Sequence, residues 1–171
     1  MNCELKERKH IRLKTFDYSN DGDYFVTICT HNRRCFLSKI TYCEETNISK
    51  NELTPFGRIA EEELISLKKR YPFIDIDIYC IMPNHIHFII CFNNNNNKKS
   101  TLPKIIGAYK SLVTRRCKSI NDIQSVFQRS FYERIIRNDN EYYEFSVYTE
   151  NNPLKWGFDE LNPDFLKKSG E

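Results

Sequence analysis

Two histidines, His85 and His87, have side chains that could take part in chemistry, and one apolar residue separates them. Side chains alternate between the two faces of a β-strand, so on a strand both imidazoles point to one side, while Ile86 and Phe88 point to the other, into the core. The pair offers two adjacent nitrogen ligands to one metal ion, and ligand type alone would place zinc first. Strand histidines are more often structural or solvent-facing, so the pair by itself does not establish a metal site.

A second pair of reactive residues lies near the C-terminus. Tyr148 and Asn152 are four residues apart, which places a phenol and a carboxamide on the same face of a helix. Taken singly, a tyrosine is usually a packing residue, and an asparagine before a proline is usually a helix stop. These two residues therefore gain meaning only in combination with the histidines.

The histidines are expected on the second strand of a hairpin. Residues from Ile74 to Cys80 alternate between apolar and polar side chains, as in a half-buried strand. Pro83-Asn84 then suits a turn, because proline cannot donate to a sheet ladder, and His85 to Phe92 forms the returning strand. An earlier strand is predicted at 23–29, which is rich in aromatic and β-branched residues, and a polar stretch at 42–51 separates it from the next element.

Three helices are predicted to accompany these strands. Helices at 55–70 and 102–118 each follow a threonine cap, carry a proline near the start and keep apolar residues at helical spacing. A last helix, from Glu141 to about Asn151, follows a polar segment that can cap it, and it carries Tyr148. With a possible strand inside 126–137, the element order favours an α+β fold, in which helices pack on one ferredoxin-like antiparallel sheet.

Length and composition favour one folded intracellular domain over 1–171, with a core of about 23–156. Apolar residues make up 40% and charged residues 29%, which excludes a disordered chain. No apolar run reaches the roughly 18 residues that cross a bilayer, and no signal peptide is visible, so a cytoplasmic location without membrane contact is expected.

Seven scattered cysteines are interpreted as reduced thiols. The run at 93–99 predicts a mobile loop, and Trp156 is expected to pack back on the core.

Basic residues form two clusters, although the net charge of +3 is too small to indicate a nucleic-acid partner. Such clusters predict contacts with phosphates, while a merely solvated helix face is the alternative. The first cluster lies along the helix at 102–118 and includes the polar Ser111 beside its basic residues, and the second lies within 126–137. The candidate residues are Lys104, Lys110, Ser111, Arg115, Arg116 and Lys118 in the first cluster, and Arg129, Arg134 and Arg137 in the second.

Read together, four segments resemble the single-tyrosine HUH transposases, and most closely the branch called REP-associated tyrosine transposases. They are Met82–Ile90, Tyr109–Ser111, Phe127–Arg134 and Tyr148–Pro153. The resemblance extends over about 24–156, and the histidine and tyrosine segments are its specific parts. It implies a single HUH nuclease domain that cuts single-stranded DNA during DNA transposition and recombination.

The resemblance also implies a role for each candidate residue. His85, His87 and Asn152 would bind Mg²⁺ or Mn²⁺, which would withdraw charge from the scissile phosphate. Tyr148 would attack that phosphate, forming a 5′-phosphotyrosine and releasing a 3′-hydroxyl. The expected partner is single-stranded DNA folded into a hairpin. Mobile-element members commonly carry glutamine at the position of Asn152, so the third ligand is the least certain, and no general base is apparent.

Several alternatives stay open at this stage. The protein could be a domesticated hairpin-DNA-binding protein with little cleavage, or a replication-initiator or relaxase nuclease with the same histidine pair and tyrosine. Nucleoid association and an active site completed by a homodimer partner are also compatible with the resemblance. The resemblance to the REP-associated branch, however, implies a monomer. The hairpin sequence and present mobility are not predicted.

Overall fold

A four-stranded antiparallel sheet forms the centre of the molecule, in a computed structural model that describes residues 17–18, 20–43, 48–93 and 100–168. The strand order is β4-β5-β1-β6, and every neighbouring pair is antiparallel. The strands are β1 (Gly22–Cys29), β4 (Ile74–Ile81), β5 (His85–Phe92) and β6 (Tyr132–Ile136). The predicted α+β fold and the β4-β5 hairpin are therefore confirmed, and the possible strand within 126–137 is β6.

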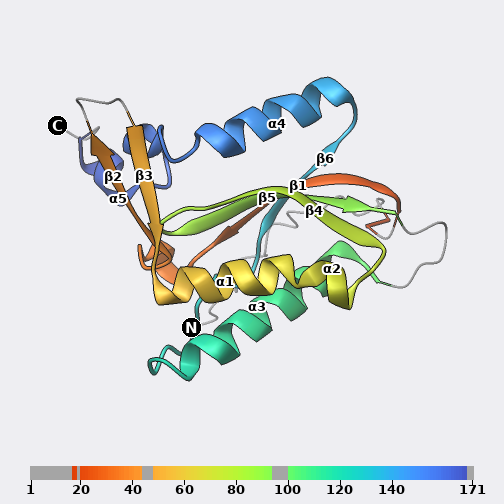
Figure 1. Cartoon of the computed structure of the whole chain (residues 1–171), viewed down its shortest axis with the longest axis horizontal. Helices are drawn as coiled ribbons and strands as arrows, with labels where there is room; N and C mark the ends of the chain where they lie inside the picture. The colour runs from red at the N-terminus through yellow and green to blue at the C-terminus, as the bar shows by residue number, and fades with distance from the viewer. Residues whose placement is uncertain (1–16, 19, 44–47, 94–99, 169–171) are drawn as a thin grey trace, which may run out of the picture.

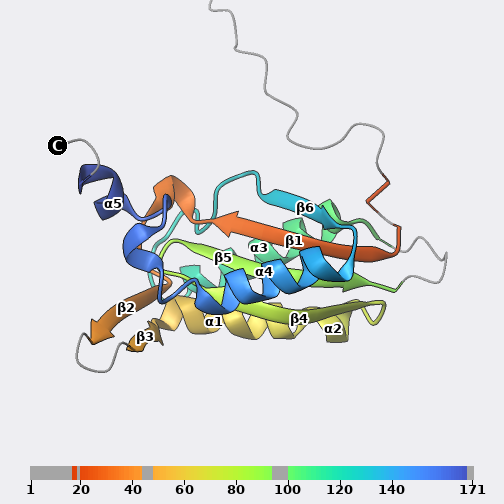
Figure 2. The ribbon, with the colours of Figure 1, turned by 90° about the horizontal axis from the view of Figure 1, so that it is seen from above.

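Helices cover both faces of this sheet (Figure 1). One layer contains α1 (Pro55–Ile65), α2 (Leu67–Arg70) and α3 (Leu102–Lys118), while α4 (Asp139–Asn151) lies across the other face, against β4 and β5. Figure 2 shows α4 crossing in front of the strands, with α1 and α3 behind them. No described helix is both long enough and apolar enough to cross a bilayer.

Local signals set the helix boundaries. The side chain of Thr54 accepts a hydrogen bond from the Gly57 amide at 3.2 Å, which caps α1 as expected. The predicted helix at 55–70 is divided at Ser66 into α1 and α2. Asn138 caps α4 by accepting from the Glu141 amide, so α4 begins at Asp139, two residues earlier than predicted.

The sheet separates two apolar clusters of unequal size. In the larger one, Ile86 and Phe88 of β5 pack with side chains of α1 and α3, including the fully buried Tyr109. In the smaller one, Phe25, Ile89 and Ile136 pack with partly buried side chains of α4. Because side chains alternate along β5, the face that carries Ile89 also carries His85 and His87. The histidines thus face α4 and not the main core, as the sequence predicts.

A second sheet occupies the region predicted to be a polar connection at 42–51. It is a hairpin of β2 (Ser38–Cys43) and β3 (Ile48–Leu53), which, among the described strands, pair with each other and not with the main sheet. These strands mix polar and apolar residues, and of their described residues Leu53 packs against the main core, so the alternation that marks β4 is missing. The short elements η1 (His31–Arg33), η2 (Trp156–Phe158) and α5 (Pro163–Lys168) were also not predicted. The predicted mobile loop at 93–99 lies, apart from Asn93, outside the described residues.

Candidate active site

The two histidine rings lie side by side between the sheet and α4. Their centroids are 4.5 Å apart, and His85 and His87 are 0% and 3% exposed. The ring of His87 stacks on Phe25 of β1 at 5.2 Å, and Phe25 in turn stacks on Phe145 of α4 at 4.5 Å. Aromatic packing therefore fixes the pair in a dry layer where polar atoms need partners.

Asn84 fixes the proton position of His85. The Asn84 amide group donates to the carbonyl oxygens of Arg33 at 3.2 Å and Leu161 at 2.7 Å, so its oxygen is the atom that faces His85 Nδ1 at 2.8 Å. An amide oxygen can only accept, so Nδ1 carries the proton and Nε2 carries the lone pair. The Thr27 hydroxyl lies 2.8 Å from Nδ1 of His87, and a hydroxyl can either accept from Nδ1 or donate to it. Both rings are held at Nδ1, which leaves Nε2 available to a metal ion.

Tyr148 and Asn152 approach this pair from the end of α4. The Tyr148 ring lies 5.3 Å from the ring of His87, and Tyr148 is 43% exposed, so its hydroxyl can meet a substrate. Asn152 forms the C-cap of α4 in helical conformation and is 2% exposed. Its side-chain amide lies near enough to His85 and Tyr148 to contribute to the pKa shift of each. The structure therefore brings together the four residues that the sequence places in one site.

The donor atoms of this site fit a metal ion. Within the described part of the chain, three buried atoms lack a hydrogen-bond partner here: His85 Nε2, His87 Nε2 and Asn152 Oδ1. Leaving a buried polar atom unsatisfied costs about 1–3 kcal/mol, and a shared cation would satisfy all three. Among the described residues, no group of three or more His, Cys, Asp or Glu side chains could hold a metal ion. A cation shared by the two histidines would therefore need a donor of another type, and the unsatisfied amide oxygen of Asn152 is available for it.

Burial keeps the imidazoles neutral and the phenol protonated. Removal from water lowers the pKa of His85 to about 3 and that of His87 well below its ordinary value, so both rings remain available as ligands. The pKa of Tyr148 is raised, first by burial and then by the carboxylate of Asp159. A nearby cation would oppose these effects on Tyr148 and favour its phenolate.

The neutral histidines should make the metal-free protein sensitive to mild acid. The unfolded chain binds protons at His85 and His87 near pH 6.5, whereas the folded chain resists protonation to a much lower pH. Their contribution to stability is therefore fully present above pH 6.5 and is lost as pH falls. We expect about 2 kcal/mol of loss for each histidine between pH 7 and pH 5, measured by urea unfolding with EDTA present.

The matched control is the double variant His85→Gln/His87→Gln, which removes both titrating rings but keeps polar side chains. Its unfolding free energy should change much less over the same interval. If the wild type and the double variant lost equal stability on acidification, the histidines would not be the neutral buried groups described above.

Sequence reasoning missed four residues of this site. Asn84 was predicted only as a turn residue, although its position directly before His85 was a usable signal. Thr27 is the Cα partner of His87 across the β1-β5 ladder, which only the register reveals. The Asp159 carboxylate is 8% exposed and lies 3.8 Å from His85 Nε2. Trp156, predicted to pack on the core, is partly buried with its ring 6.1 Å from that of His85.

Comparison with known proteins identifies relatives of this chain. No protein-family model matches the chain. An uncharacterised protein of Haemophilus influenzae is 30% identical over 181 residues, which cover 95% of this chain and 97% of that protein. A REP-associated tyrosine transposase of Escherichia coli is 26% identical over 141 residues, which cover 82% of this chain and 72% of that protein. A solved REP-associated tyrosine transposase bound to a REP hairpin matches 87% of this chain and 76% of its own, with a TM-score of 0.64 and 22% identity.

The chain belongs to the REP-associated tyrosine transposase family. The family assignment agrees with the sequence segments around His85 and Tyr148, and the solved structure supports the same fold. The remaining candidate residues of this family member are the basic ones, and the structure distributes them over two faces.

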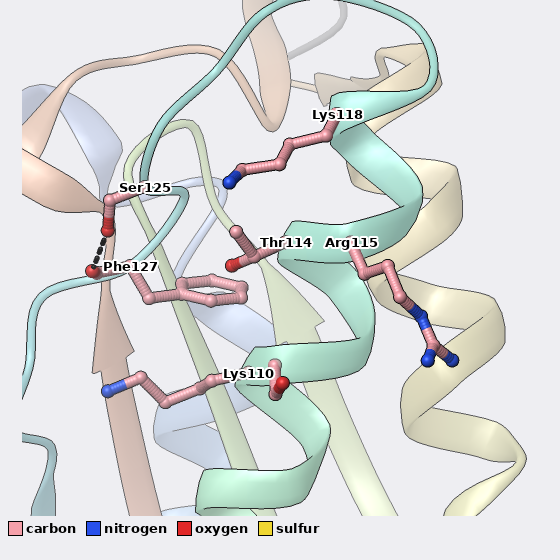
Figure 3. A pocket seen from close by; sticks show the side chains of 7 residues that line it. Lys110, Thr114, Arg115, Lys118, Ser125 and Phe127 are labelled. Atoms are coloured by element: carbon pink, nitrogen blue, oxygen red, sulfur yellow. Dashed lines mark hydrogen bonds between the residues drawn. The ribbon is translucent and has the colours of Figure 1, made fainter.

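Most residues of the first basic cluster surround a pocket beside α3, on the face of the sheet opposite Tyr148. The pocket measures about 390 Å³. In Figure 3, Lys110 and Lys118 point across it toward the segment of Ser125 and Phe127, whereas Arg115 points away. Its lining consists of Lys110, Ser111, Thr114, Arg115, Lys118, Ser125 and Phe127. Lys104 is exposed on an earlier turn of α3.

Two members of this cluster have protein partners. The Lys110 ammonium donates to the carbonyl oxygens of Gln128, Arg129 and Ser130, so it holds the segment that leads into β6. The Arg116 guanidinium is 2.5 Å from Glu62 and 2.9 Å from Glu63, which ties α3 to α1. These contacts give both residues a structural role, whatever they contribute to DNA binding.

The second cluster reaches the face that carries Tyr148. Arg134 pairs with Phe25 in the β1-β6 ladder, and its guanidinium lies 5.6 Å from the ring centroid of Phe145. Tyr132 lies on the same face, opposite Thr27, and is 51% exposed. Arg129 and Arg137 are exposed at the two ends of this strand. The edge strand β6 therefore presents a cation and an aromatic ring next to the histidine pair.

Proposed function

We propose that the protein is a metal-dependent single-stranded DNA endonuclease and transposase that acts on hairpin-containing DNA. In this proposal it forms a covalent 5′-phosphotyrosine intermediate on Tyr148. The observation that carries the proposal is the set of three buried acceptors on His85, His87 and Asn152, which lie beside the Tyr148 ring without hydrogen-bond partners among the described residues. A cation would satisfy all three acceptors at once, and Tyr148 would present a nucleophile next to it.

Each residue of the site would contribute a separate step. Bound Mg²⁺ or Mn²⁺ supplies charge withdrawal and orientation for the scissile phosphate. Asn84 and Thr27 hold the imidazoles so that both Nε2 atoms face the metal position. The phenolic oxygen of Tyr148 then attacks phosphorus, the bond from phosphorus to the 3′ oxygen breaks, and a 3′-hydroxyl leaves. The covalent bond to Tyr148 conserves the phosphodiester energy for rejoining.

The distribution of basic residues favours a hairpin with a single-stranded extension. The structural neighbour was solved with a REP hairpin, so the same class of ligand is proposed here. Tyr132 and Arg134 on β6 can stack on a base and contact a phosphate on the way to Tyr148. The pocket of α3 faces away from Tyr148 and can hold a separate part of the backbone.

The direct test is formation of a covalent complex. A pool of DNA hairpins with randomised single-stranded flanks is incubated with the protein and Mn²⁺, and the products are separated under denaturing conditions. We expect a slowly migrating protein–DNA adduct that disappears with EDTA and with fully duplex DNA. Tight hairpin binding without an adduct in either Mg²⁺ or Mn²⁺ would favour the alternative, a domesticated hairpin-binding protein.

The α3 pocket gives a separate prediction about affinity. Replacing Arg115 and Lys118 together by alanine should weaken hairpin binding and flatten its dependence on salt by about one unit of log–log slope for each lost phosphate contact. Lys110 is left in place because its loss would release the segment before β6. Fluorescence anisotropy at 50–200 mM salt provides the measurement.

A matched control uses Lys69, an exposed lysine of α2 that does not line the pocket. Lys69→Ala removes one positive charge without touching the proposed surface, so its salt slope should equal that of the wild type. An unchanged slope in the Arg115→Ala/Lys118→Ala variant would identify the α3 surface as an ordinary solvated helix face.

A further inference from the structure

The carboxylate of Asp159 faces an atom that cannot give it a hydrogen. Its Oδ2 lies 3.8 Å from Nε2 of His85, and the side chains are 8% and 0% exposed. Because Asn84 holds the proton on Nδ1, Nε2 presents a lone pair. Two buried acceptors that face each other beyond hydrogen-bond distance need a donor or a cation between them, and a cation satisfies both at once. This gap is a specific feature of the described site.

The chain holds Asp159 in this position through several hydrogen bonds. Its Oδ1 accepts from the Leu161 amide at 2.7 Å, which leaves Oδ2 for the site. The carbonyl oxygen of Leu161 accepts from Asn84 at 2.7 Å, and the Asn162 side chain donates to the carbonyl oxygen of Trp156 at 2.9 Å. Asn84 therefore orients His85 with one atom and anchors the Asp159 segment with another. The carboxylate is part of a built structure and not of a free tail.

We propose that Asp159 is an anionic ligand of the same metal ion as His85, His87 and Asn152. This inference rests on the proposed function, and it extends the ligand set with a residue of the C-terminal segment. Two donor atoms that are each about 2.1 Å from one ion can be at most about 4.2 Å apart, and the observed 3.8 Å is within that limit. In the observed arrangement no group of three His, Cys, Asp or Glu side chains among the described residues could hold a metal ion, so metal binding would have to draw the carboxylate of Asp159 inward.

The added carboxylate would decide which metal is preferred. Two imidazoles and one amide form a neutral set, which favours zinc over magnesium or manganese. Mg²⁺ and Mn²⁺ prefer oxygen donors, above all carboxylates, and a negative ligand partly neutralises their charge in a buried place. Asp159 would therefore shift the preference of this site from Zn²⁺ toward Mn²⁺ and Mg²⁺.

Metal binding to the full-length protein without DNA tests this inference. Free Mn²⁺ is followed by electron paramagnetic resonance during titration of the wild type, Asp159→Asn and Glu160→Gln. Asparagine keeps the oxygen that accepts from the Leu161 amide, so the segment should retain its conformation. Glu160→Gln removes the same charge from the exposed neighbouring residue and is the matched control. Thermal unfolding with EDTA present verifies that all three proteins fold.

We expect Asp159→Asn to weaken Mn²⁺ binding by about tenfold or more. Loss of a residue that only hydrogen-bonds a metal ligand already weakens metal binding by about tenfold, and loss of a direct ligand should cost no less. Zn²⁺ binding should fall less, and Glu160→Gln should match the wild type. Unchanged or tighter Mn²⁺ binding in Asp159→Asn would overturn the inference while leaving the proposed function intact. A wild-type protein that binds no Mn²⁺, and forms no adduct with hairpin DNA, would refute the proposed function and this inference with it.

Discussion

Replacing Tyr148 by phenylalanine should abolish the covalent protein–DNA adduct and leave the fold and hairpin affinity unchanged. The substitution removes one oxygen from a side chain that is 43% exposed, so the folded protein loses at most the contact of that oxygen with the Asn152 amide. The ring contacts with His87 and Phe25, at 5.3 Å and 6.0 Å, are available to phenylalanine as well. Only the nucleophilic oxygen disappears, and with it the covalent step. Denaturing electrophoresis and anisotropy measure the two properties.

Two other tyrosines of α4 serve as controls. Tyr143 is 70% exposed, and the Tyr142 hydroxyl donates to Asp77 of β4, so neither faces the histidines. Tyr142→Phe and Tyr143→Phe should therefore form the adduct at the rate of the wild type. Adduct formation that persists in Tyr148→Phe and is lost in one of these controls would assign the nucleophile to a different tyrosine.

Loss of either imidazole should abolish cleavage while sparing most of the hairpin affinity. In His85→Gln and His87→Gln the cation would lose one of its nitrogen ligands, and metal assistance is worth several kcal/mol in the transition state. A loss of about 4 kcal/mol corresponds to about a 10³-fold decrease in the rate of adduct formation. Hairpin affinity should stay within about threefold, because phosphate contacts made elsewhere supply most of it. Single-turnover kinetics with Mn²⁺ and anisotropy without metal separate the two effects.

Asn152→Ala provides a graded comparison for this prediction. Its amide oxygen is a neutral donor, and water can occupy the place of a neutral oxygen ligand, so the rate should fall less than in the histidine variants. Adduct formation at the wild-type rate in both histidine variants would contradict metal-assisted attack. An equal fall in hairpin affinity and rate would show instead that the histidines support the fold or the binding surface.

The sequence alone determined the elements whose signals are local. The alternation from Ile74 to Cys80 and the turn at Pro83 define the β4-β5 hairpin, because side-chain direction on a strand changes with every residue. The same rule places His85 and His87 together and away from Ile86. Helical spacing places Tyr148 one turn before Asn152, and the polar segment that begins at Asn138 predicted the last helix, although α4 begins at Asp139 and not at the predicted Glu141.

Local patterns could not predict the β2-β3 hairpin or the division of the helices between two faces of the sheet. Among the described strands, the two of that hairpin pair with each other and not with the main sheet, so neither shows the one-sided alternation that burial imposes. The face that a helix covers depends on how the chain connects the elements. As a result, the basic residues of α3 lie on the face opposite Tyr148.

Only the tertiary structure decided how the candidate site is completed. The pairing of Thr27 with His87 follows from strand register, and the double contact of Asn84 with His85 and Leu161 joins segments that are distant in sequence. Asp159 follows no periodic pattern, because its position is set by hydrogen bonds within its own turn and by the packing of that turn on β5. Periodicity reports which way a side chain points along one element. The residue that this side chain contacts depends on the packing of all the other helices and strands.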